Sequence, residues 1–167
     1  MLKEKIQNSL NKQLNMELFS SYEYLAMSAY FKEKNLDGFS HWFAVQSQEE
    51  YGHAMKIYDY INQANGKVKL TKIDEPNANW KTVIDVLKET YQHEKKVTAA
   101  INSLVDLAIS LKDHATNNFL QWFVSEQVEE ENTALNILEK LKLIADSKDG
   151  LFLLDRELGQ RAVTSKG

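Results

Sequence analysis

The sequence predicts an all-α fold: a four-helix bundle with one long crossover and a short C-terminal fifth helix. Four long segments contain no proline, and apolar residues recur in each of them at helical spacing. The connections between these segments alternate short, long and short, as in a bundle with a single crossover. The chain has only 6 glycines and 1 proline in 167 residues, which disfavours an all-β domain with many tight turns.

Residues 5–34 and 38–65 form the first predicted pair of helices. Their apolar stripes begin at Ile6 and Phe39 and continue at intervals of three and four residues. Residues 35–38, with the sequence NLDG, form a short turn between them. Because the connection is so short, the two helices are expected to lie antiparallel.

Residues 66–79 form a long polar link that contains Gly66 and Pro76. A helix of about 28 residues is about 42 Å long, and 14 extended residues reach at most about 46–50 Å. The link is therefore just long enough to run the length of the bundle and start the third helix at the opposite end.

Residues 80–111 and 113–144 form the second predicted pair, again joined by a short break and again antiparallel. Asp113 is placed to cap the start of the fourth helix, and Ser147 to cap a last short helix at about 147–158. We expect one domain, with the four-helix bundle in residues 1–146 and the short helix and tail in residues 147–167.

Composition excludes several classes of function. The formal charge is −4, from 20 basic and 24 acidic residues, and no basic run indicates a nucleic-acid partner. The absence of cysteine excludes disulfides, thiolate zinc sites, iron–sulfur clusters and cysteine nucleophiles. No apolar stretch reaches the roughly 18 residues of a membrane span, and residues 1–6 lack the apolar core of a signal peptide. We therefore expect a cytoplasmic protein with no membrane partner.

Each apolar stripe is interrupted near its middle by side chains that do not belong in an apolar core. These are Glu17 on the first helix, Glu50 and His53 on the second, Glu94 on the third, and Gln127 and Glu130 on the fourth. Members of each pair are three residues apart and therefore share a helix face. His41 and His93 are expected at the surface, since His93 points about 100° away from Glu94.

The interrupting acids are expected at nearly one depth in the bundle. Counted from the first turn, Glu17 lies 19 residues before Leu36 and Glu50 lies 14 residues after it. Counted from the second turn at Lys112, Glu94 and Glu130 each lie 18 residues away. At about 1.5 Å per residue, the four helices direct their acids towards one point.

Four buried carboxylates cannot all remain charged without a compensating charge of about +4, because desolvation and mutual repulsion are too costly. Two divalent metal ions supply that charge, and carboxylates with a Glu-x-x-His pair are the ligand set of di-iron bundles. Only one half of this chain has Glu-x-x-His, whereas the other half has Gln127-x-x-Glu130. The two metal positions are therefore expected to be unequal.

At these residues the sequence resembles the bacterial non-haem ferritins, over nearly the whole chain. The segments that carry the resemblance are EEYGH at 49–53, KDHAT at 112–116, FLQW at 119–122 and EQVEEE at 126–131. Such ferritins oxidise Fe(II) inside each subunit and store ferric mineral in a hollow shell of twenty-four subunits. The resemblance implies an iron storage protein with ferroxidase activity, a homo-oligomer of 24 subunits, and O2 or H2O2 as the oxidant.

The resemblance also implies iron ligands, for two to three ions per subunit. Glu17, Glu50 and His53 would hold the first iron, and Glu50 would bridge to the second. The remaining ligands of the second iron come from the third and fourth helices: Glu94, Gln127 and Glu130. A third, inner iron would be held by an acidic group on the second and fourth helices: Glu49, Glu126, Glu129 and Glu130.

Other roles follow from the resemblance with alternatives left open. Tyr24 would donate a hydrogen bond to a ligand or give an electron, and Trp122 would lie near the site, although both could simply pack in the core. Glu126 and Glu129, together with Glu131, could instead form a solvated acidic face. Asp113 and His114 correspond to a region near the three-fold pores, or they are only an N-cap and a surface histidine.

Haem is not expected, because Tyr51 follows the bridging glutamate where bacterioferritins have a haem-ligating methionine. The apolar run at residues 151–154 is expected to pack at a subunit contact, since its exposure to water would be costly. Two other functions remain open from the sequence. One is a di-metal carboxylate oxidase or oxygenase on the same bundle, and the other is a metal-free structural bundle.

Overall fold

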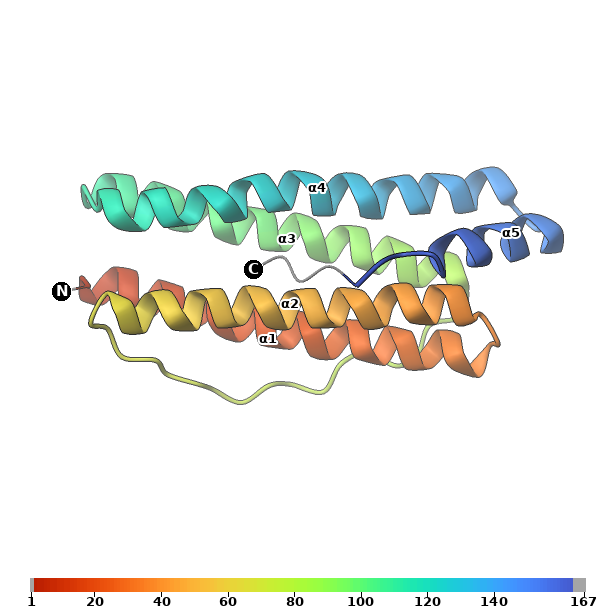
Figure 1. Cartoon of the computed structure of the whole chain (residues 1–167), viewed down its shortest axis with the longest axis horizontal. Coiled ribbons are helices and arrows are strands. Elements are labelled where there is room, and N and C mark those ends of the chain that lie inside the picture. Colours follow the sequence, from red (N-terminus) through yellow and green to blue (C-terminus); the bar gives the residue numbers. More distant parts are fainter. Residues whose placement is uncertain (1, 164–167) are drawn as a thin grey trace.

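The bundle is built from two helical hairpins that lie side by side, with a fifth short helix at one end (Figure 1). The computed structural model describes residues 2–163, and within that range every regular element is an α-helix. The helices are α1 (Glu4–Glu33), α2 (Asp37–Gln63), α3 (Val83–Ser110), α4 (His114–Ile144) and α5 (Lys148–Leu158). The predicted all-α four-helix bundle with one long crossover and a short fifth helix is confirmed.

The helix boundaries follow local capping chemistry. The Asp113 side chain accepts a hydrogen bond from the Thr116 N–H at 3.1 Å, and Ser147 accepts one from the Gly150 N–H at 3.0 Å, as predicted. Thr82 forms a capping box with Asp85, so α3 begins at Val83 rather than at residue 80.

Three helices end in the same way. The Leu36 N–H donates to the Phe31 carbonyl at 3.0 Å, which closes α1 with a Schellman-type bond. The residue before it, Asn35, has a φ of 57°, a left-handed conformation that asparagine tolerates better than most residues. The same pattern recurs after α2 at Asn65 and after α3 at Lys112. The endings at Asn35 and Lys112 turn the two hairpins within a few residues, and the ending at Asn65 starts the crossover.

The crossover, residues 64–82, runs along the bundle and is held by two asparagines of α1. The Asn11 side chain accepts from the Lys69 N–H at 2.6 Å and donates to the Lys67 carbonyl at 2.9 Å. Asn15, one turn later, accepts from the Thr71 N–H at 2.8 Å and donates to the Lys69 carbonyl. Side-chain amides thus satisfy backbone groups of a segment that has no regular partner strand.

The fifth helix packs against the start of α2. A Cβ atom on Gly38 would lie 1.6 Å from the Asp155 carbonyl oxygen, so only glycine fits this approach. The Asp155 carboxylate accepts from the Phe39 N–H at 2.9 Å, which places a negative charge at the N-terminus of α2. After α5 the chain turns back along α2 (Figure 1).

The apolar core is divided into two clusters by a polar layer. One cluster lies toward α5 and contains a stack of Phe31 on Phe39 and Phe43, with ring centroids 4.8 and 5.2 Å apart. The other lies toward the N-terminus of α1 and includes Leu10 and Ile57. The layer between them contains the acids that interrupt the apolar stripes.

Within residues 2–163, no helix combines the length and apolar character needed to cross a membrane. The predicted domain limits of 1–146 and 147–167 stay a prediction, and they include residues 1 and 164–167, which lie outside the described part of the chain.

Candidate metal centre

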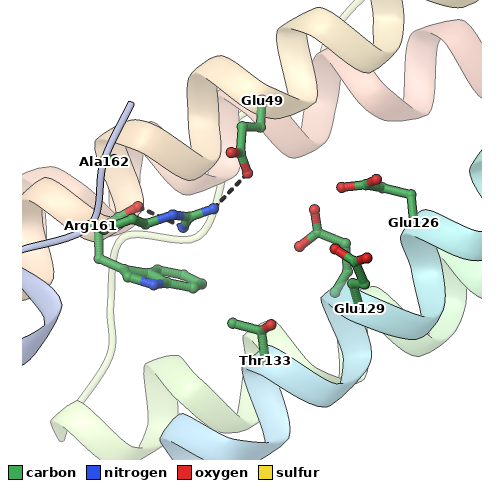
Figure 2. Close-up of a pocket in the computed structure, with 8 residues that line it drawn as sticks. Glu49, Glu126, Glu129, Thr133, Arg161 and Ala162 are labelled. Carbon is green, nitrogen blue, oxygen red and sulfur yellow. Dashed lines mark hydrogen bonds and ion pairs between the residues drawn. The ribbon is translucent and has the colours of Figure 1, made fainter. Parts of the chain in front are cut away.

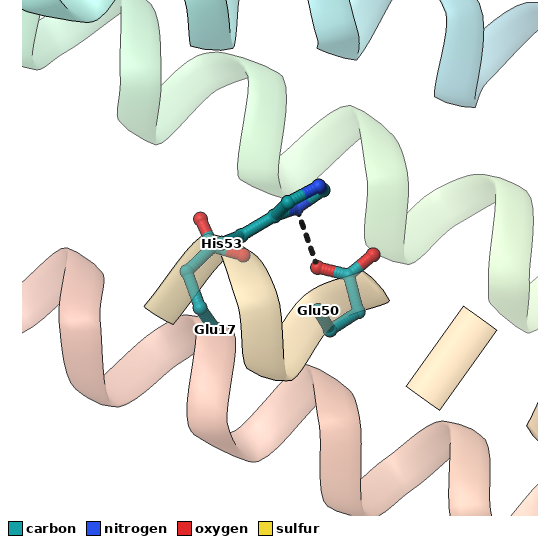
Figure 3. Close-up of side chains that lie close together, drawn as sticks. All are labelled: Glu17, Glu50 and His53. Carbon is teal, nitrogen blue, oxygen red and sulfur yellow. Dashed lines mark ion pairs between the residues drawn. The ribbon is translucent and has the colours of Figure 1, made fainter. Parts of the chain in front are cut away.

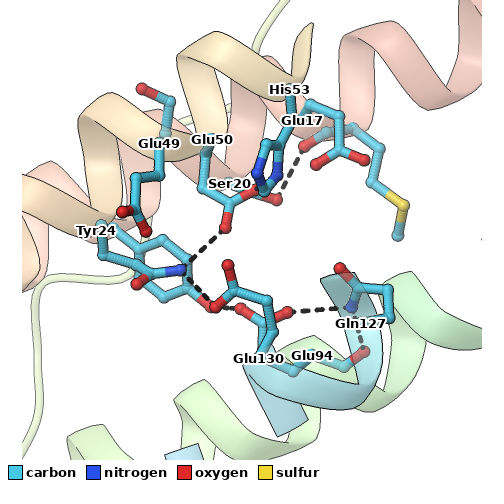
Figure 4. Close-up of polar contacts among 12 residues, drawn as sticks. Glu17, Ser20, Tyr24, Glu49, Glu50, His53, Glu94, Gln127 and Glu130 are labelled. Carbon is cyan, nitrogen blue, oxygen red and sulfur yellow. Dashed lines mark hydrogen bonds and ion pairs between the residues drawn. The ribbon is translucent and has the colours of Figure 1, made fainter. Parts of the chain in front are cut away.

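The six interrupting side chains lie together in the middle of the bundle (Figure 4). All are buried; the exposed fractions are 1% for Glu17, 3% for Glu50 and 2% for Glu94. The others are His53, Gln127 and Glu130. These residues therefore lie at one depth in the bundle, as predicted from their distances along the chain from the two turns.

Glu17, Glu50 and His53 form the first group that could hold a metal ion. One ligand atom from each lies within 4.8 Å of the others (Figure 3). His53 Nδ1 is 3.3 Å from Glu50 Oε2. Gln13 Nε2 donates to Glu17 Oε1 at 2.6 Å, but Glu17 Oε2 is buried without any hydrogen-bond partner. A buried carboxylate oxygen left unsatisfied is unusual, and a bound cation would satisfy it.

Glu50, Glu94 and Glu130 form a second group within the same distance limit. Glu50 belongs to both groups, so its carboxylate is placed to bridge two cations. Gln127 Nε2 donates to Glu94 Oε2 at 3.1 Å, and the Tyr24 hydroxyl donates to Glu94 Oε1. Gln127 thus orients a ligand of the second group through its amide N–H (Figure 4).

Gln46 is a residue of this centre that the sequence reasoning missed. Its Nε2 donates to Glu130 Oε2 at 2.7 Å and to Glu50 Oε1 at 3.1 Å. It joins acids from two hairpins and is fully buried. Its position one turn before Glu50 was the available signal, because residues four apart share a helix face. Gln13 has the same relation to Glu17.

The expected inner acidic group is only partly brought together. Glu126 is buried and forms a third candidate group with His53 and Glu130, a combination that the sequence did not predict. Glu129 is exposed, and Glu49 is ion-paired with Arg161. A cavity of about 380 Å3 nevertheless has all four predicted acids in its lining (Figure 2). The alternative that Glu126 belongs to a solvent-exposed acidic face is therefore wrong, because its side chain is buried.

Burial dominates the electrostatics of the centre. It raises the pKa of Glu17 to about 8, with a further contribution from the charge of Glu50. Burial and the charge of Glu94 raise the pKa of Glu130 to about 8. Burial raises the pKa of Glu94 to about 7, and the pKa of Glu50 lies well above its usual value for the same reason. Without cations, the site therefore holds protons near neutral pH.

Two aromatic residues border the centre. Burial, and then the charge of Glu94, raise the pKa of Tyr24 well above its usual value, so its hydroxyl remains a donor. The Trp122 ring lies perpendicular to the His53 ring, with centroids 5.2 Å apart. Trp122 is thus near the site, as expected, while its functional role stays a prediction.

The surface placement of His93 was wrong. Its exposed fraction is 8%, and its Nε2 lies 2.7 Å from Ser20 Oγ while its Nδ1 lies 3.1 Å from Glu23 Oε2. His93 does point away from Glu94, as the helical spacing predicts, but it points toward polar side chains of α1 and not toward solvent. Burial lowers the pKa of His93 to about 4. His41, also expected at the surface, is half-buried, and its Nε2 donates to the Arg161 carbonyl at 2.8 Å.

Carboxylates and an imidazole, drawn from all four helices into two groups that share one glutamate, are the arrangement of the di-metal carboxylate bundle proteins. Comparison with known proteins narrows this class. The family model described as a ferritin-like domain matches residues 7–144, and the chain belongs to the ferritin family.

Relatives match over the full length. The bacterial non-heme ferritin of Bacteroides fragilis is 45% identical over 161 residues, which are 96% of this chain and 100% of that protein. The bacterial non-heme ferritin of Campylobacter jejuni is 39% identical over 166 residues, 99% of each chain. An open pore ferritin from the archaeon Archaeoglobus fulgidus has 47% identity and a TM-score of 0.96, covering 97% of this chain and 100% of that one.

Proposed function

We propose that the protein is an iron storage protein with ferroxidase activity. It oxidises Fe(II) with O2 or H2O2 inside each subunit and stores ferric oxyhydroxide in a shell of 24 copies. The observation that carries the proposal is the sharing of buried Glu50 by two metal-ligand groups in a chain of the ferritin family. A metal-free structural bundle gives no reason to bury four carboxylates.

The ligands suit iron as a substrate. Carboxylate oxygens are hard ligands, and a single imidazole completes a set that binds Fe(II) and leaves positions open to an oxidant. Glu17, Glu50 and His53 hold the first Fe(II), and Glu50, Glu94 and Glu130 hold the second. Binding expels the protons that burial keeps on these carboxyls, and two Fe(II) ions supply the charge of about +4 that the site needs.

Oxidation follows from having two Fe(II) ions side by side. Together they give O2 two electrons, and two protons from solvent complete H2O2, so no one-electron oxygen product is released. Anionic ligands stabilise Fe(III) more than Fe(II), because the attraction grows with the cation's charge. Tyr24 holds Glu94 through its hydroxyl and is also placed to supply an electron.

The diferric product leaves through the acidic cavity between α2 and α4. Glu126 shares Glu130 and His53 with the di-iron centre and also lines this cavity, so the two are continuous. Glu49, Glu126, Glu129 and Glu130 form the inner iron position. Hydrolysis of Fe(III) beyond it builds the mineral.

Assembly is proposed to use α5. Phe152 and Leu153 have exposed fractions of 62% and 63%, while Leu154 is buried beneath them. Two large exposed apolar side chains side by side favour a contact with another subunit. Asp113 and His114 lie at the start of α4, the region proposed to border a pore.

One experiment tests the proposal. Metal-free protein is mixed with two Fe(II) per subunit in air, and ferric-oxo absorbance is followed in the near ultraviolet. Glu94→Gln should slow the reaction by at least roughly 10- to 100-fold, which is the usual loss when a residue that only orients a metal ligand is changed. The exposed Glu139→Gln, which makes the same change of charge outside the site, should match the wild type. Wild-type oxidation no faster than buffer would reject the ferroxidase; oxidation only with an organic substrate would favour an oxygenase.

A further inference from the structure

The C-terminal tail places a fixed positive charge inside the acidic cavity. Arg161, one of two arginines in the chain, follows α5 and lies against α2. Its Nη2 is 2.5 Å from Glu49 Oε2, and the side chains are 20% and 8% exposed, respectively. Its Nη1 donates to the Trp42 carbonyl at 3.3 Å, and its guanidinium lies 4.5 Å from the centroid of the Trp42 ring.

Among the described residues 2–163, the guanidinium is the one basic group in the lining of this cavity, alongside four glutamates. Arginine stays protonated at any physiological pH, so it cannot lose its charge when a metal ion arrives. The Arg161 guanidinium and a divalent cation therefore compete for the carboxylate of Glu49. Because the two cations repel each other, Arg161 beside Glu49 weakens the binding of the metal ion there.

The segment after α5 can also move away from α2. Within the described part of the tail, residues 159–163, the Arg161 side chain and the hydrogen bond from His41 to the Arg161 carbonyl contact α2. Ala162 and Val163, the next residues, are exposed, so moving them uncovers no apolar core. Withdrawal of Arg161 exchanges an ion pair for a metal–carboxylate contact, and it gives up the hydrogen bond to the Trp42 carbonyl and the stacking on the Trp42 ring.

We propose that Arg161 is a displaceable counterion: it neutralises Glu49 while the inner iron position is empty, and iron must push it aside to bind there. This inference rests on the proposed inner position. Its consequence is that Arg161 weakens the hold on the third iron without affecting the two ions of the di-iron centre. Iron is then passed inward instead of being retained.

The test is calorimetric titration of the full-length assembled protein, with Zn²⁺ in air and with Fe(II) under anaerobic conditions. Arg161→Gln should bind the third ion about 10-fold more tightly, within the usual range for coupled sites. The first two ions should bind as in the wild type. Arg161→Lys, which keeps the charge but loses the planar fork, should lie closer to the wild type than Arg161→Gln does. Arg156→Gln removes the same charge from the exposed face of α5, and it should bind all three ions with wild-type affinity.

A crystal structure with the third position loaded gives a second readout. Glu49 should contact the ion, and Arg161 should no longer contact Glu49. An unchanged third-ion affinity in Arg161→Gln, or an Arg161–Glu49 pair intact beside the bound ion, overturns the inference. Failure of the ferroxidase assay with normal Arg161-dependent Zn²⁺ binding would reject the proposed function alone.

Discussion

Glu17→Gln should stabilise the metal-free protein at neutral pH. Glu17 is 1% exposed, and its pKa is raised from 4.5 to about 8. A carboxyl whose pKa is raised in the folded state makes stability fall with pH, because the folded protein holds a proton that the unfolded chain has released. Glutamine removes this proton uptake and keeps an oxygen that accepts from Gln13.

The size of the effect follows from the pKa values. The free energy of unfolding that Glu17 removes from the wild type grows over the roughly 2.5 pH units between pH 4.5 and pH 7. At about 1.4 kcal/mol per pH unit, it reaches about 3 kcal/mol at pH 7. For a chain of this size, about 3 kcal/mol corresponds to roughly 6–12 °C in melting temperature. The difference should shrink as the pH falls and approach zero below pH 4.5, where Glu17 of the unfolded chain is also protonated.

Scanning calorimetry with a chelator at pH 5, 6, 7 and 8 measures this difference. Glu139→Gln, at an exposed position, should show no pH-dependent gain. With excess Zn²⁺ the wild type should melt at a higher temperature than Glu17→Gln, because the wild type gains the binding energy of an ion that the variant holds poorly. A Glu17→Gln protein that melts at or below the wild-type temperature at pH 7 without metal would refute the reasoning about buried charge.

Three further predictions concern the site and the fifth helix. Tyr24→Phe removes the donor to Glu94 and should cost about 1.5–3 kcal/mol of stability; it should also slow Fe(II) oxidation in stopped-flow experiments without changing the number of ions bound, and an unchanged rate counts against a role for the hydroxyl. Gly38→Ala forces a methyl group into the Asp155 backbone and should lower stability by about 1–3 kcal/mol in calorimetry, whereas an unchanged melting temperature contradicts the tight approach. Removal of residues 147–167 should leave the helical circular dichroism of the bundle but weaken or rearrange assembly, and a full-sized shell by light scattering would refute the proposed contact.

The sequence was most informative about features that depend on helical geometry alone. Helix number, the antiparallel hairpins and the caps at Asp113 and Ser147 followed from spacing and local hydrogen bonding. The common depth of Glu17, Glu50 and Glu94 followed from counting residues from each turn. A fixed rise per residue makes such positions calculable before the helices are packed.

Contacts across helices were harder to predict. His93 was expected at the surface, yet Ser20 and Glu23 of α1 bury it. Glu126 was grouped with Glu49, Glu129 and Glu130, and the unexpected member of its surroundings is His53, which has a ligand atom within 4.8 Å of the Glu126 carboxylate. In both cases the direction of the side chain could be predicted, whereas the particular residues that it meets on the neighbouring helix could not.

The sequence by itself determined which residues form the helices, where each helix ends, and that buried acids meet at one level of the bundle. Tertiary structure alone decided that Gln46 connects the two hairpins and that Arg161 reaches Glu49. The physical reason is one of range. Helical periodicity is fixed by backbone bonds four residues apart, whereas these contacts join residues 84 and 112 positions apart and exist only after the helices and the tail have packed.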